Sequence, residues 1–164
     1  MFRRAALLLT LLFSSCDSGE PNKVTQDDYE GPVAEAAVRH LIAHLPPLDP
    51  EVPKVYCIVK GPHLENTHMS FAGRMKDLNL RFVSGIILKV RESDRNVYDP
   101  DSGLSPVTLQ ISQSNRVGTD TYEVVAGWAY MKKFERRQYK MRASNGGYEV
   151  IKDERIEGNF TPSS

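Results

Sequence analysis

The 164-residue sequence lacks an apolar run near the eighteen residues that a membrane-spanning helix needs. It has only two cysteines, Cys16 and Cys57, which allow at most one disulfide. It also lacks a charge excess, because 21 basic residues balance 21 acidic ones. The balance gives no support to a nucleic-acid partner, which would usually require a basic excess. The remaining composition, 40% hydrophobic and 26% charged, is typical of one globular domain.

The first fifteen residues have the layout of an export signal. Arg3 and Arg4 form a charged start, residues 5–13 are a nine-residue apolar run, and Ser14 and Ser15 follow. Nine helical residues reach only about 13 Å, which is too short to span a bilayer. We therefore predict that residues 1–15 are a signal peptide that is removed.

The run ends in Leu12-Phe13-Ser14-Ser15-Cys16, which resembles the lipobox of bacterial lipoproteins. The resemblance implies cleavage before Cys16 and lipidation of its sulfur, usually with acylation of the new amino group. Two or three acyl chains would anchor a protein stably. We expect a lipid-anchored protein of the bacterial cell membrane, with its domain on the periplasmic or extracellular side. The alternative is an ordinary secretory signal and a disulfide between Cys16 and Cys57.

The segment after Cys16 is predicted to be a tether. Residues 17–31 carry one aliphatic side chain, Val24, and cannot bury enough surface to order themselves. With Cys16, residues 16–31 form a lipidated and flexible linker with a span of roughly 20 Å. The globular domain is expected over 32–157, followed by a disordered tail at 158–164.

The domain is predicted to be α+β. Pro32 opens a helix that ends before Pro46-Pro47, and its apolar stripe consists of Ala34, Val38, Leu41, Ile42 and Leu45. Residues 54–60 are apolar on both faces, which predicts a strand covered on both sides. Phe71, Met75 and Leu78 have the spacing of a short second helix. Further alternating runs are 80–91, with Gly85 as a bulge, 107–112 and 122–131.

The last segment contains the strongest local signal. Asn145-Gly146 between two alternating runs predicts a two-residue hairpin. Its register places Ser144 opposite Gly147, Met141 opposite Val150, and Arg142 opposite Glu149. The sum is one main N-terminal helix, with a second short one, packed on an antiparallel sheet of five or six strands.

This order of elements, closing with YKMRASNGGYEVIKDERI, resembles the cystatin-like and nuclear-transport-factor-like superfamily over residues 33–156. The resemblance implies a cone-shaped domain with a pocket between helix and sheet. Members include enzymes and binding modules. No catalytic residue is carried over, because no matching acid-base motif is present.

A basic cluster precedes the hairpin, within eleven residues interrupted by Glu135. Its members are Lys132, Lys133, Arg136, Arg137, Lys140 and Arg142. The first five are candidates for contact with an anionic surface, at roughly 1 kcal/mol per residue near a membrane. The alternative is cancellation by the next strand, where Glu149 faces Arg142 and Glu154 faces Arg137.

The histidines and the aspartates of the loop at 94–101 do not match a metal-binding motif. His40 and His44 have the i, i+4 spacing of a zinc protease, but Leu41 stands where that motif has its glutamate. With His63 and His68 they make only two weak pairs, so we predict no metal site. Asp94, Asp99 and Asp101 do not match a calcium loop and favour a polar turn.

Cys57 lies in an apolar strand, which favours a buried thiol over a nucleophile. Aromatic side chains have period two, typical of core, although they would also suit a ligand cavity between helix and sheet: Tyr122, Trp128, Tyr130, Tyr139 and Tyr148.

These observations favour a non-catalytic lipoprotein without a cofactor, which binds an envelope protein or a small ligand. The alternatives are a small enzyme with a pocket between helix and sheet, and a structural envelope component that acts by oligomerisation.

Overall fold

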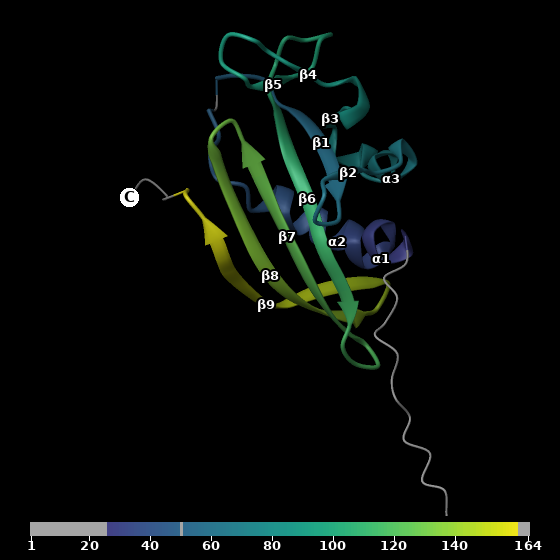
Figure 1. Cartoon of the computed structure of the whole chain (residues 1–164). Coiled ribbons are helices and arrows are strands. Elements are labelled where there is room, and N and C mark those ends of the chain that lie inside the picture. The colour runs from purple at the N-terminus through teal and green to yellow at the C-terminus, as the bar shows by residue number, and fades with distance from the viewer. Residues whose placement is uncertain (1–25, 50, 161–164) are drawn as a thin grey trace, which may run out of the picture.

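The computed structural model describes residues 26–49 and 51–160. Within these ranges the chain is α+β, as predicted, with helices on one face of a large twisted sheet (Figure 1). The helices are α1 (Gln26–Glu30), α2 (Pro32–Ala43) and α3 (Met69–Gly73). The strands are β1 (Val55–Lys60), β2 (Glu65–Asn66), β3 (Arg81–Phe82), β4 (Lys89–Val90), β5 (Val97–Tyr98), β6 (Pro106–Arg116), β7 (Thr121–Tyr130), β8 (Lys133–Ser144) and β9 (Gly147–Gly158).

The main sheet has the order β2-β1-β6-β7-β8-β9, and β3 also pairs with β1. It has seven strands rather than five or six, because β2 and β3 are two-residue strands. Most pairs are antiparallel, but β1 is parallel to both β6 and β3. Parallel neighbours need a long crossover, and residues 61–105 supply it between β1 and β6.

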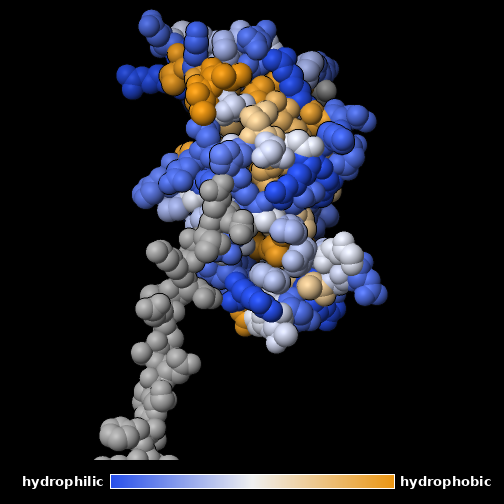
Figure 2. Space-filling view, turned by 90° about the vertical axis from the view of Figure 1, so that its right-hand side faces the viewer, coloured by the Kyte–Doolittle hydropathy of each residue, from blue (hydrophilic) through white to orange (hydrophobic). Residues whose placement is uncertain are grey.

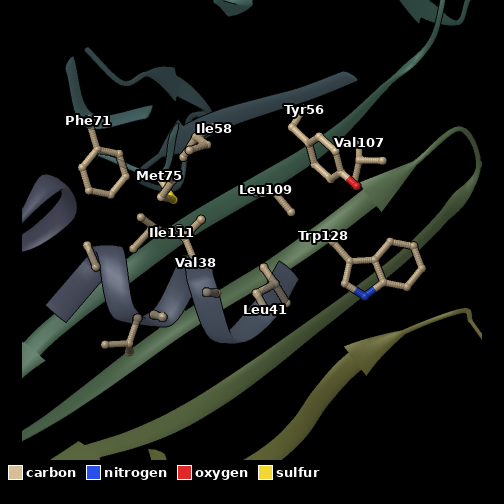
Figure 3. Packing of buried hydrophobic residues seen from close by; sticks show 14 of the residues in the cluster. Val38, Leu41, Tyr56, Ile58, Phe71, Met75, Val107, Leu109, Ile111 and Trp128 are labelled. Atoms are coloured by element: carbon tan, nitrogen blue, oxygen red, sulfur yellow. The ribbon is translucent and has the colours of Figure 1, made fainter. Parts of the chain in front are cut away.

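The helix α2 forms as the sequence predicts. Gly31 is its N-cap, Pro32 occupies the first turn, and the C-cap is His44. Of the predicted stripe, Ala34, Val38 and Leu41 are buried, while Ile42 and Leu45 are partly buried against the same core. Figure 3 shows Val38 and Leu41 pointing from α2 toward Leu109, Ile111 and Trp128 of the sheet.

The strand β1 is covered on both faces, which confirms the prediction for 54–60. Tyr56 and Ile58 join the main core beneath α2. Val55, Cys57 and Val59 form a second, smaller core with Val83, flanked by Leu88 and Leu104. The chain between β3 and β6 therefore crosses to the face of the sheet opposite α2 and covers β1 there.

The predicted strand over 80–91 is wrong. This segment consists of β3, a 3₁₀ turn at Gly85–Ile87 and β4, and the side chains of Ile86 and Val90 are exposed. Gly85 is not a bulge. A Cβ atom at this position would lie 2.0 Å from Asn66 Oδ1, so the glycine lets the turn pack closely against β2.

The predicted second helix over 71–78 is divided into α3 and a 3₁₀ turn at Lys76–Leu78. Phe71 and Met75 are fully buried, so the apolar spacing identified the buried side chains correctly.

The hairpin of β8 and β9 has the predicted register from Ser144↔Gly147 to Met141↔Val150. Beyond it, Ile151 and Ile156 are the extra residues at two bulges in β9. The bulges shift the pairing, so Arg137 lies opposite Arg155 and not Glu154.

The folded part extends past the predicted boundaries at residues 32 and 157. The helix α1 lies in the predicted tether, and Glu30 accepts a hydrogen bond from Lys60 Nζ at 2.7 Å. At the other end, the ring of Phe160 packs edge-to-face on Trp128, with 5.5 Å between ring centroids.

Candidate functional site

A groove lies on the face of the sheet opposite α2, which we call the open-face groove. Its floor consists of the outward positions of β6, β7 and β8, and one wall is the β4–β5 hairpin. The loop between β1 and β2 and the turn between β7 and β8 complete the rim. The volume is about 390 Å³, within the range of small-molecule sites.

The floor is low because its central side chains are small. Thr108, Ala129 and Phe134 lie side by side on β6, β7 and β8, and in the next row Gly127 lies between Gln110 and Arg136. A Cβ atom on Gly127 would lie 2.4 Å from the carbonyl oxygen of Glu135 and 2.9 Å from Cγ of Arg136. The glycine therefore lets the stem of Arg136 cross the floor.

The rim contains strained backbone. Leu64, Arg95 and Met131 each have φ between 54° and 57°, a region that large side chains seldom occupy. They belong to three different loops, and all three line the open-face groove. Such conformations cost about 1–3 kcal/mol each and cluster at functional sites. Leu64 and Met131 are also more than half exposed, although both are apolar.

The charged residues that line the groove are both cations. Among its lining residues, all within the described part of the chain, two are arginines, Arg95 and Arg136, and there is no carboxylate, imidazole or thiol. Arg136 Nη1 donates to Glu157 at 2.9 Å, between two half-exposed side chains. Its Nε is buried and has no hydrogen-bond partner among the described residues. A buried donor in this state costs about 1–3 kcal/mol unless water or a ligand accepts from it.

A polar hollow adjoins the groove. It shares Leu64, Gln110 and Arg136 with the groove and continues along the outer end of β6 to Tyr29 of α1. Its other lining residues on β6 are Ser112, Gln113 and Asn115. Arg136 therefore lies at the junction of an apolar hollow and a hollow rich in amide and hydroxyl groups.

Exposed apolar side chains gather on the segment beside the groove. Ile86, Ile87, Val90 and Val97 are between 41% and 78% exposed. Figure 2 shows apolar surface at the upper end of the molecule, where β4 and β5 lie in Figure 1.

The structure divides the predicted basic cluster between several places. Lys132 is in the turn between β7 and β8, and Lys133 begins β8. Arg136 and Lys140 alternate with residues of the core face and point to the open face, whereas Arg137 is on the helix side. Contact of the five residues with an anionic surface stays a prediction, and the structure does not bring them together on one face.

Arg137 belongs to an ionic network between α2 and the last two strands. It contacts Asp153 at 2.5 Å and Glu135 at 2.9 Å, and Glu135 also lies 3.4 Å from Arg155. This network cannot be predicted from the sequence, because the bulges in β9 decide which charges meet.

His40 adjoins the network, with Nε2 at 3.5 Å from Asp153 Oδ2. Burial, and then the nearby His44, lowers the pKa of His40. His44 stacks on His40 with 4.1 Å between ring centroids. His63 and His68 are exposed, and no group of three metal-ligating side chains lies close together within residues 26–49 and 51–160.

The other predicted features are structural. Asp99 is fully buried and accepts hydrogen bonds from Arg81, Ser102 and the backbone of Asp101, so the polar-turn interpretation is confirmed. Trp128, Tyr130 and Tyr139 are buried in the main core. Tyr122 and Tyr148 pack against its edge.

Cys57 is buried, as predicted, and burial raises the pKa of its thiol to about 11. Cys16 lies outside the described residues, so its lipidation stays a prediction. None of the helices formed by the described residues is long and apolar enough to cross a bilayer.

The open-face groove was not among the sites predicted from the sequence. One signal was available: in β7 the large residues Trp128 and Tyr130 alternate with the small residues Gly127 and Ala129. Small residues at every second position predict a low floor on the opposite face of the sheet.

No protein-family model, curated protein or solved structure matches this chain.

Proposed function

We propose that this protein is a bacterial lipoprotein, held at the membrane through Cys16, whose α+β domain binds a ligand in the open-face groove without catalysing a reaction. The lipobox-like sequence at residues 12–16 supports the anchor. The observation that carries the binding role is the position of Leu64, Arg95 and Met131, whose left-handed backbones all lie on the rim of this groove.

The chemistry of the groove favours binding over catalysis. Its lining has neither a pair of titratable groups for acid-base catalysis nor a nucleophile with an adjacent base. The pocket between helix and sheet that the cystatin-like resemblance implies would lie on the other face, where the five aromatic residues named above pack in or against the core. An enzyme in that position therefore has less support than a binding domain.

The anchor is tested with Cys16→Ala in the native host. We expect the wild type to fractionate with membranes and to start at Cys16, with the added mass of acyl chains. The variant is expected to be unprocessed or released. Equal membrane retention of a processed variant would contradict the anchor.

The groove is tested by native mass spectrometry of protein purified from the same host. We expect a bound species on the wild type that is lost in Ala129→Trp, because the indole would fill the groove floor. Thr121→Trp is the matched control, since Thr121 lies on the same strand and face but outside the groove. A bound species that survives Ala129→Trp, or none in any protein, would rule out the proposed site.

A further inference from the structure

We propose that the ligand of the open-face groove is a single-chain anionic lipid, with its acyl chain in the groove and its head group at Arg136 in the adjoining polar hollow. This inference rests on the proposed binding function and specifies its ligand.

The walls suit an acyl chain. Leu64, Val97, Met131 and Phe134 present apolar side chains, and Gly127 and Ala129 leave the floor open between them. These side chains offer no hydrogen bonds that would fix a polar ligand. Methionine is unbranched and adapts to a flexible apolar chain. These four apolar side chains therefore recognise an apolar chain through contact area, while the groove is also lined by the polar residues Asn96, Ser105, Thr108 and Gln110.

The charged residues in the lining favour an anionic head group. Arg95 and Arg136 line the groove without any carboxylate beside them in the lining. The buried Nε of Arg136 is a donor without a partner among the described residues, although Nη1 is engaged by Glu157. The Arg136 side chain is 40% exposed, so a phosphate or carboxylate oxygen accepts a charge-assisted hydrogen bond from its guanidinium, which a head group without an anionic oxygen cannot form.

The adjoining hollow accommodates the rest of the head group. It begins at Arg136 and continues past Ser112, Gln113 and Asn115. Hydroxyl and amide side chains both donate and accept hydrogen bonds, which suits the glycerol and phosphate oxygens of a lipid head. The order along the surface, apolar hollow, arginine, polar hollow, is the order of acyl chain, phosphate and polar head in a lysophospholipid.

The test is calorimetric titration of residues 16–164, the chain that remains after removal of the predicted signal peptide, carrying Cys16→Ala, with two lipids of equal chain length below their micellar concentrations. The lipids are myristoyl lysophosphatidylglycerol, which is anionic, and monomyristoylglycerol, which has the same acyl chain and a glycerol head but no phosphate and no charge. We expect the anionic lipid to bind at least tenfold more tightly. Arg136→Gln should reduce this preference to twofold or less, because the glutamine keeps the stem but has no charge.

Two further variants separate the contributions of chain and charge. Thr108→Trp, which fills the floor, should abolish binding of both lipids. Lys140→Gln removes a cation from the same strand and face outside the groove, and it should leave the preference unchanged. Circular dichroism verifies that each variant is folded.

Equal binding of the two lipids, or a preference that survives Arg136→Gln, would overturn the anionic-lipid inference while leaving the groove as a binding site. Absence of binding by both lipids would also overturn it, and the host-purified species described above would then decide the proposed function separately.

Discussion

The imidazole of His40 on α2 lies against the carboxylate of Asp153 on β9, with 3.5 Å between Nε2 and Oδ2. The pair connects the main helix to the last strand of the sheet. Burial nevertheless dominates the titration of His40, and its pKa lies below the ordinary value of 6.5. The electrostatic effects of His44 and Arg137 also lower the pKa of His40, whereas Asp153 raises it.

This pKa predicts a pH-dependent stability. The unfolded chain binds the proton more tightly than the folded one, so the free energy of unfolding should fall as pH drops below about 6.5. Above that pH the His40 contribution is constant. The free energy of unfolding, measured with urea between pH 5 and 8, should depend less on pH in His40→Gln than in the wild type. His63→Gln, at an exposed position, should keep the pH dependence of the wild type. The same pH dependence of the free energy of unfolding in both variants would contradict the assignment to His40.

Gly127→Ala should destabilise the domain by about 1–3 kcal/mol, because the new methyl group meets the backbone of the neighbouring strand at 2.4 Å. Gly73→Ala is the control, since a methyl group at Gly73 has no heavy atom within 4 Å. Chemical denaturation should show a loss for the first variant and a change within about 0.5 kcal/mol for the second. Equal stability of the two would show that the sheet yields at this position.

Asp99→Ala should cost about 1–3 kcal/mol, because it removes a buried acceptor shared by Ser102, Arg81 and the backbone of Asp101. The hydrogen bond from Ser102, with those from the loop and the charge of Arg81, lowers the pKa of Asp99. Asp101→Ala is the matched control, since the Asp101 side chain is 75% exposed and its single ion pair, with Arg81, is long at 4.0 Å. Thermal unfolding should separate the two variants at pH 7, and similar losses would argue against a special role of Asp99.

Cys57 should be unreactive in the folded protein. Burial raises the pKa of its thiol to about 11, so little thiolate forms at pH 8 and access is blocked. In the Cys16→Ala variant, where Cys57 is the remaining cysteine, iodoacetamide should label the protein slowly in buffer and fully in guanidinium chloride. Rapid labelling in buffer would mean that the smaller core opens readily.

The sequence predicted those parts of the fold that depend on neighbours along the chain. The Asn145-Gly146 turn and the period-two alternation on either side determine the hairpin register near the turn, because a two-residue loop leaves little freedom in pairing. Pro32, the apolar stripe and Pro46-Pro47 delimit α2 within a residue or two. The double-sided apolar pattern of β1 correctly predicted cover on both faces.

The strand predicted over 80–91 does not form, and the reason is physical. Its alternating apolar residues satisfy the pattern of a strand, but only β3 at its start finds a hydrogen-bonding partner on β1. The rest crosses to the other face, covers Cys57 and leaves Ile86 exposed. Alternation reports which side chains prefer burial, and it does not report whether a strand has a partner.

The sequence by itself determined the element types, the hairpin and the face of α2 that is buried, since these follow from hydrogen bonds and periodicity within short stretches of chain. Only the tertiary structure decided where the groove lies. It combines residues of three loops, a turn and four strands, and it depends on the backbone conformations of Leu64, Arg95 and Met131. Contacts between segments that are distant in sequence hold those conformations, and no local propensity favours them in leucine, arginine or methionine.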